Sequence, residues 1–292
     1  MSKIAQINTG QPDSVGEFNI SRLIPNRYTD AVGPFVFLDH LPPSVKPARK
    51  PAVPDGSHAH PHRGIATFSY VLSGELQHYD SMGNHGVVSA GGAQWMKAGN
   101  GIIHDEGLSP KFQQEGGILH SVQFWVNLPA KNKAETPAYI QLNPDEVPTV
   151  FLPNEAGTLR ILIGEYEGSV SKVERYSPQY LYEINLKPGA GFTLTSEAGW
   201  EHAIFIPEGT ADINGQPVAA GELATMENGT NLLHLKNTTG SQVTLLIFGG
   251  EHYHEPIVAR GPFVMNSYME IAQAYTDYSS GKYGEIRYKL AN

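Results

Sequence analysis

The chain of 292 residues contains 20 Lys and Arg, 29 Asp and Glu, 12 His and no Cys, so its formal charge is −9 with histidine neutral. The lack of Cys excludes disulfides, thiolate metal sites and a Cys nucleophile, so any metal must sit on nitrogen and oxygen ligands. The one short basic cluster, Lys46, Arg49 and Lys50, is too small to form a phosphate-neutralising stripe, and direct nucleic-acid binding is not expected.

The first residues of the chain have no apolar core of the kind that a secretion signal carries. No run elsewhere approaches the roughly 18 consecutive apolar residues of a membrane span. The sequence therefore predicts a cytoplasmic protein without membrane contact.

Composition and periodicity predict a mostly β fold. With 31 Gly, 21 Pro and 17% charged residues, the chain favours short strands joined by tight turns over long surface helices. Residues 65–72 are rich in strand-forming side chains, and residues 118–128 place Val122, Phe124 and Val126 on one face of a strand. Both segments are expected in a core sheet.

A weak repeat relates the two halves. Ser89-Ala-Gly-Gly92 resembles Ala219-Ala-Gly-Glu222, and residues 100–104 resemble residues 230–234. Two similar β-barrels in tandem would explain this likeness, and chance similarity is the alternative. The Pro- and Asn-rich segment 131–155 is the natural connection between the barrels. We therefore expect domains at residues 1–135 and 136–292.

One helix is predicted near the C-terminus, between Ser267 and Gly281. Ser267 and Glu270 have the spacing of a capping box, and the glycine ends the helix. The residues expected on its packed face are Ile271, Tyr275 and Tyr278.

The histidines point to a metal site in the first half. In extended backbone, residues two apart point the same way, so His60 and His62 of the His58-Ala-His60-Pro-His62 segment can converge inside a barrel. His104 and Glu106 repeat this spacing on a later segment. Neighbouring strands would then combine three imidazoles and one carboxylate, whereas a lone strand histidine or a His-rich loop would be solvent-facing or an adventitious binder.

Four segments carry more specific motifs, and a fifth, Gly33-Pro-Phe-Val-Phe-Leu-Asp39-His40, supports them. The four are His60-Pro-His62-Arg63-Gly64, residues 94–106, Gln123-Phe-Trp-Val-Asn-Leu-Pro129 and Gly261-Pro-Phe-Val-Met-Asn266. On these motifs the chain resembles the pirin family of bicupin proteins over nearly its whole length. The resemblance implies two cupin barrels and one metal, in the N-terminal barrel only, held by His60, His62, His104 and Glu106.

The chain departs from the wider pattern at several positions. Ala66 stands where many cupins have Glu, and Lys236 stands in the repeat where Glu106 stands. The second half also lacks the His-x-His unit, so it is not expected to bind metal. His252 and His254 have no assigned role. They are either solvated residues or the ligands of a weak surface metal site.

The expected cofactor is one divalent transition metal. Ligand type admits Mn, Co, Ni, Cu, Zn or Fe, and the resemblance points first to Fe(II). Four protein ligands on an ion that prefers six would leave positions for water, substrate or O₂.

The resemblance implies two kinds of function. Some pirins open the heterocyclic ring of quercetin-type flavonols with O₂, and Glu106 would then be a ligand and a proton acceptor for the flavonol 3-hydroxyl. Mammalian pirins are instead regarded as iron-dependent cofactors of transcription regulators, so a non-catalytic protein that binds a regulatory partner is the alternative. The candidates for an aromatic lining are Phe68, Trp95, Phe124 and Trp125, and for each of them an ordinary position in the barrel core is the favoured alternative. The candidates for orienting the ligand imidazoles are Asp39, His40 and Gln123.

Overall fold

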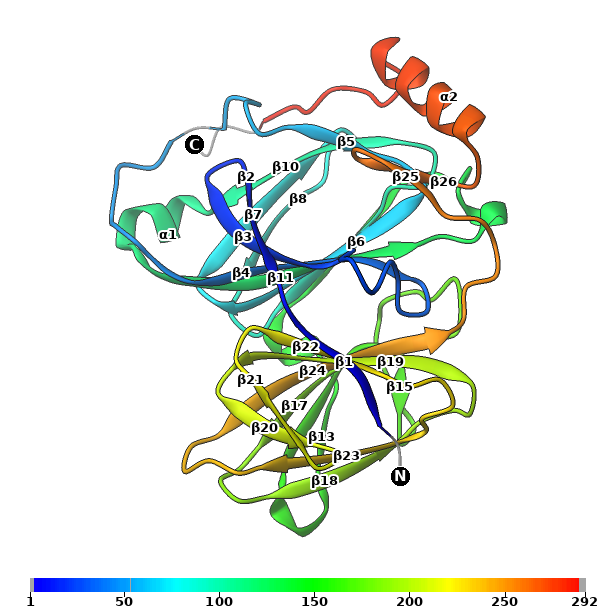
Figure 1. The fold of residues 1–292 in the computed structure, drawn as a ribbon. Helices are drawn as coiled ribbons and strands as arrows, with labels where there is room; N and C mark the ends of the chain where they lie inside the picture. Colours follow the sequence, from blue (N-terminus) through cyan, green and yellow to red (C-terminus); the bar gives the residue numbers. More distant parts are fainter. Residues whose placement is uncertain (1–2, 53, 289–292) are drawn as a thin grey trace. The chain divides into compact units, whose positions relative to one another are not determined.

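The structure is a computed structural model, which describes residues 3–52 and 54–288. Within them, the chain forms two units, each assembled from separate segments (Figure 1). The first unit contains Gly16–Phe18, Pro43–Pro144 and His254–Asn292, and the second contains Met1–Val15, Asn19–Pro42 and Asp145–Tyr253. This assembly differs from a division into continuous halves at residue 135, which stays a prediction.

Two antiparallel sheets form the body of the first unit, as expected for a cupin barrel. Strand β6 shows why they form, since seven of its nine residues are buried and most are β-branched or aromatic. Four consecutive strands of a seven-stranded sheet are β12 (Ala138–Leu142), β9 (Ala93–Lys97), β6 (Ile65–Ser73) and β11 (Gly117–Asn127), in that order. The other has the order β5 (His60–His62), β10 (Ile102–Leu108), β7 (Glu75–Asp80) and β8 (His85–Ser89).

The first unit ends in a short hairpin and a helix. Strands β25 (Val258–Arg260) and β26 (Phe263–Met265) pair with each other, and α2 (Tyr268–Ser279) contacts both (Figure 1). A further helix, α1 (Pro110–Glu115), joins β10 to β11.

The predicted C-terminal helix is confirmed, and its packed face differs in part. The Ser267 hydroxyl accepts a hydrogen bond from the Glu270 amide, as the capping box predicts. Ile271 is buried, but Tyr275 and Tyr278 are 43% and 38% exposed. The buried stripe instead continues through Ala274 and Asp277. Asp277 faces inward because Arg63 pairs with it at 2.7 Å.

The second unit also contains two antiparallel sheets, so the interpretation of the repeat as tandem barrels is confirmed. One is β1 (Ile4–Thr9), β22 (Glu222–Met226), β19 (Trp200–Glu208), β24 (Val243–Glu251), β17 (Gln179–Leu186), β14 (Gly157–Ile163) and β13 (Thr149–Phe151). The other is β18 (Gly191–Thr195), β23 (Leu232–Asn237), β20 (Thr210–Ile213) and β21 (Gln216–Ala219). A small hairpin, β15 (Glu165–Tyr166) and β16 (Ser169–Val170), adds to them.

The alternation along β23 explains the interior of the second barrel. Leu233 and Leu235 are buried in its apolar core, while His234 and Lys236 alternate with them and are exposed. The positions that the repeat matched to His104 and Glu106 therefore point outward, and leucines face the core.

The remaining elements are β2 (Gln11–Val15), β3 (Phe18–Ile24) and β4 (Phe35–Lys46), with short 3₁₀ turns at Ala130–Asn132, Pro144–Glu146 and Pro153–Glu155. β3 pairs with β4 through Arg22 and Asp39. Among the described residues, no helix has the length and apolar character needed to cross a membrane.

Candidate metal centre

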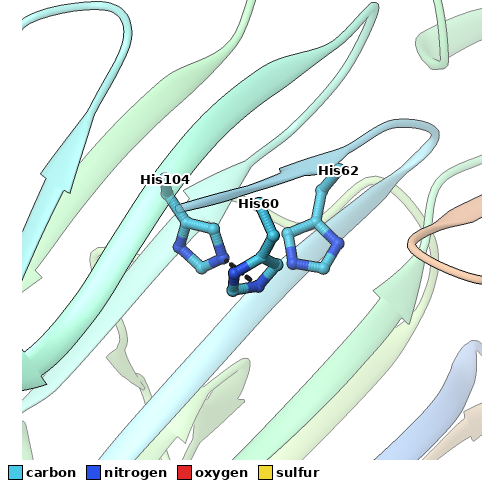
Figure 2. Close-up of side chains that lie close together, drawn as sticks. All are labelled: His60, His62 and His104. Carbon is cyan, nitrogen blue, oxygen red and sulfur yellow. Dashed lines mark hydrogen bonds between the residues drawn. The ribbon is translucent and has the colours of Figure 1, made fainter. Parts of the chain in front are cut away.

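Three imidazoles meet inside the first unit. His104 on β10 lies opposite His60 of β5, and Ile102, two residues earlier, lies opposite His62. The period of two therefore places all three histidines on one face, and their ligand atoms lie within 4.8 Å of one another. Figure 2 shows the rings turned toward a common point, with Nε2 of His60 and Nε2 of His104 2.9 Å apart.

Backbone carbonyls set the tautomers of two of these rings. Nδ1 of His60 lies 2.9 Å from the His58 carbonyl, and Nδ1 of His62 lies 3.1 Å from the Pro262 carbonyl. A carbonyl only accepts, so each Nδ1 carries the proton and each Nε2 keeps its lone pair. Among the described residues, Nε2 of His62 is buried without a hydrogen-bond partner. These are the features of imidazoles prepared for a metal ion.

Burial keeps two of the rings, those of His62 and His104, neutral. His62 and His104 are 1% and 0% exposed, and desolvation lowers the pKa of each well below the usual range. Repulsion from the neighbouring histidines lowers both further, while the Pro262 carbonyl partly opposes the shift at His62. Since the neutral ring is the ligand form, the three donors fit a divalent transition metal.

Glu106 lies beside this triad, on the same face of β10 as His104. Its carboxylate groups with His104 and His78 within 4.8 Å, and not with His60 and His62. The facing sheet holds it: Gln123 Nε2 donates at 2.7 Å, Ser69 Oγ donates at 3.2 Å, and Gln94 Nε2 also donates. Ser69 lies between Gln94 and Gln123 in strand register, so one row of three neighbouring strands fixes the carboxylate.

The C-terminal hairpin of β25 and β26 contacts residues next to the histidines. Arg63, next to His62, forms a parallel bridge with Phe263 and donates to Asp277 of α2. Lys133 is 3% exposed. Its ammonium donates to the Gly64 carbonyl at 2.7 Å, the Val264 carbonyl at 2.8 Å and Asn127 Oδ1 at 2.6 Å. Three segments far apart in the sequence are thereby fastened beside His62.

Comparison with known proteins agrees with this geometry. The Pirin family model matches residues 17–126, and the model of the Pirin C-terminal cupin domain matches residues 181–284. The chain belongs to the pirin family.

The pirin-family relatives include two proteins of Pseudomonas aeruginosa that carry the name "Putative quercetin 2,3-dioxygenase". One is 36% identical over 86% of this chain and 87% of its own, and the other is 35% identical over 95% and 96%. The crystal structure of quercetin 2,3-dioxygenase from Acinetobacter baumannii matches with a TM-score of 0.90 and 30% identity. The match covers 98% of this chain and 100% of that one.

His78 is a residue of this pirin-family centre that sequence analysis did not identify. It is fully buried at 0% exposure and lies opposite Glu106 in register. Its Nε2 lies 3.2 Å from Asp80 Oδ2, and its ring stacks on Tyr139 at 4.5 Å. The alternation of His78 and Asp80 was visible in the sequence, but nothing there indicated that β7 pairs with β10.

The aromatic residues proposed from the sequence fall on both sides of the sheet. Phe68 lies opposite both Trp95 and Phe124, and all three are almost fully buried in a row adjacent to that of Ser69. Because side chains alternate along a strand, these three point away from Glu106 and occupy the barrel core, as the favoured alternative predicts, rather than lining the site. Trp125 does reach the centre, with its ring 4.9 Å from that of His62.

The other residues expected to orient ligands are placed as follows. Gln123, expected to orient an imidazole, donates instead to the Glu106 carboxylate. Asp39 accepts two hydrogen bonds from Arg22, and burial raises the pKa of its carboxyl to about 6 despite that partner. His40 packs against Phe205 with ring centroids 4.9 Å apart. A role of Asp39 and His40 at the metal stays a prediction.

His252 and His254 differ in their surroundings. His252 is largely exposed, and its Nδ1 lies 2.7 Å from Glu201 Oε1. His254 is also exposed. Among the described residues, neither histidine belongs to a group of three or more potential metal ligands. Both therefore stay without an assigned function.

Proposed function

We propose that this protein is a metal-dependent dioxygenase that opens the heterocyclic ring of quercetin-type flavonols with O₂. The observation that carries the proposal is the convergence of three imidazoles beside a carboxylate that three donors hold in place. The names of the relatives supply the substrate class, since several of them are named for quercetin 2,3-dioxygenation.

The proposed ligands are His60, His62, His104 and Glu106, and the proposed metal is Fe(II), with Mn, Co, Ni, Cu or Zn as the other ions that nitrogen and oxygen ligands accept. One divalent ion per chain is expected, because the residues of β23 that face the core of the second barrel are leucines, which cannot bind a metal. When bound, the ion would supply Lewis-acid polarisation of the flavonol 3-hydroxyl and the redox chemistry that O₂ requires.

The protein groups have distinct parts in this proposal. Glu106 accepts the proton of the 3-hydroxyl, since it is the carboxylate on the face that bears the imidazoles. Gln94, Gln123 and Ser69 keep its oxygens turned toward the centre by donating to them. Trp125, against His62, offers an indole surface on which a flat aromatic substrate can pack.

The test compares Glu106→Gln with His62→Ala in metal-loaded protein. The amide keeps the size and one oxygen donor but has little proton affinity, so Glu106→Gln should retain part of its metal and lose at least about 10²-fold in turnover. His62→Ala should lose both metal and turnover. Glu115→Gln, an exposed glutamate at the end of α1, is the matched control and should behave as the parent.

Two measurements on the same samples make the test decisive. Elemental analysis after purification without a metal-affinity column gives occupancy, and oxygen consumption gives turnover. The matching flavone, which lacks the 3-hydroxyl, should not be consumed. A metal-loaded parent that fails with every flavonol and every candidate ion, or a Glu106→Gln protein that turns over at the parent rate, would contradict the proposal.

A further inference from the structure

A separate cavity of about 210 Å³ lies within the second unit, which does not contain the metal centre. The hairpin of β15 and β16 and the strands β17 to β19 contribute its lining. Four of the lining side chains are aromatic: Tyr166, Tyr180, Tyr182 and Trp200. Aromatic rings at the wall of a cavity offer apolar area and a negative ring face to a ligand.

The rings are organised as a group. Tyr180 and Trp200 are stacked with centroids 6.0 Å apart and an interplanar angle of 19°, and Tyr166 meets Tyr182 edge to face at 5.9 Å. Their two innermost hydroxyls are already occupied. The Tyr180 hydroxyl lies 2.8 Å from His202 Nδ1, and the Tyr182 hydroxyl donates to the Glu165 carbonyl at 2.5 Å. Tyr180 and Tyr182 are 3% and 6% exposed, so they form the base of the cavity, and the ring surface open to a ligand belongs mainly to the half-buried Tyr166 and Trp200.

The charge of the lining is negative. Glu165, Glu167 and Glu197 contribute three carboxylates, and Arg175 contributes one cation, which pairs with Glu165 at 3.3 Å. Among the residues that the structure describes, Glu167 and Glu197 have no ion-pair partner. Negative charge beside aromatic rings attracts a cation, because the face of each ring is itself the negative end of a quadrupole.

We infer that this cavity is a second small-molecule site and that it binds a compact organic cation with a methylated ammonium group. Aromatic rings combined with carboxylates are the established way in which proteins recognise such groups. The volume supports a small ligand, since it lies below the roughly 300 Å³ at which sites for drug-sized molecules begin. A flavonol is disfavoured because it is larger.

Choline is the probe, and 3,3-dimethyl-1-butanol, its neutral isostere, is the matched control ligand. Titration calorimetry and the fluorescence of Trp200 should report one choline per chain, with affinity that falls as salt is added. The isostere should bind at least about tenfold more weakly, since it lacks the charge on which the cation–π and ionic attraction depend.

Variants locate the binding. Trp200→Leu and Glu197→Gln should each weaken choline binding several-fold, whereas Glu208→Gln, an exposed glutamate at the end of β19 and outside the cavity, should not. Tyr166→Leu provides a second aromatic deletion on a hairpin if Trp200→Leu does not fold. His62→Ala should bind choline like the parent, which separates this site from the metal centre.

Three outcomes would overturn the inference. They are equal binding of choline and its isostere, choline binding that the cavity variants leave unchanged, and no choline binding up to tens of millimolar. Saturable binding of quercetin that Trp200→Leu abolishes, in protein that does not bind choline, would also overturn it and would assign an aromatic rather than a cationic ligand.

Discussion

Replacing Lys133 by Met tests whether the C-terminal hairpin stabilises the first unit through one buried ammonium. The substitution keeps the length and apolar stem of the side chain and removes three hydrogen bonds, to Gly64, Val264 and Asn127. The Gly64 carbonyl keeps a second partner, the Leu128 amide at 3.2 Å. The Asn127 side chain is affected more, because its Nδ2 has no hydrogen-bond partner among the described residues and its Oδ1 would lose the bond from the ammonium.

The expected loss follows from these contacts. At a net value of about 1 kcal/mol for each hydrogen bond, the free energy of unfolding should fall by roughly 3 kcal/mol. Burial lowers the pKa of the Lys133 ammonium, so part of the cost of breaking the bonds is offset by no longer burying a charge. A loss of that size in a unit of about 150 residues corresponds to a fall in Tm of roughly 6–12 °C.

Thermal unfolding followed by circular dichroism, with metal content measured in parallel, provides the assay. Lys131→Met is the control, since Lys131 lies on the same 3₁₀ turn but is exposed. We expect its Tm to stay within about 1 °C of the parent, which is the range of ordinary surface substitutions. Equal Tm values for the two variants would refute the reasoning that the buried ammonium fastens the three segments.

The remaining predictions concern pH and backbone fit. Burial lowers the folded-state pKa of His62 and His104, so the unfolded chain binds more protons than the folded one below about pH 6.5. The free energy of unfolding of the metal-free protein should therefore fall as the pH falls from about 6.5, by up to about 1.4 kcal/mol per pH unit for each ring. Urea unfolding that gives the same free energy at several pH values would contradict this. Gly64→Ala should destabilise far more than Gly83→Ala: both glycines have positive φ, at 80° and 88°, but a Cβ at Gly64 would lie 2.0 Å from the Val264 carbonyl oxygen, whereas at Gly83 nothing lies within 4 Å. Similar denaturation midpoints for the two alanine variants would show that the hairpin yields to the methyl group.

Much of the centre could be predicted because it depends on local geometry. The spacing of two within His60-Pro-His62 and between His104 and Glu106 fixes one face of each strand, whatever the strands pair with. The pairing itself is non-local, and so the sequence did not reveal that β7 brings His78 opposite Glu106. Alternation alone likewise does not say which face of a strand looks toward the ligands.

The sequence could not decide whether Phe68 and Phe124 line the site or the barrel core, because alternation does not identify the face of a strand that points to the site. Phe68 and Phe124 belong to the apolar face of β6 and β11, which packs into a core, while the polar residues between them, Ser69 and Gln123, face the carboxylate. An aromatic side chain near a ligand motif suggested lining, but the polar residues of the same strands were the better guide. The cavity near Trp200 was not visible in the sequence, since its residues come from four strands and the segments between them.

The hydrogen bond from His62 to Pro262 joins residues separated by 200 positions. During translation, His62 is therefore synthesised 200 residues before the carbonyl that orients it. A nascent chain therefore cannot hold His62 in its final orientation, even after the first barrel's strands have been made. The native orientation of His62 is therefore complete only once residue 262 has been synthesised and folded into place, and a chain truncated before the Gly-Pro-Phe motif would keep the four proposed ligands but leave His62 incompletely oriented.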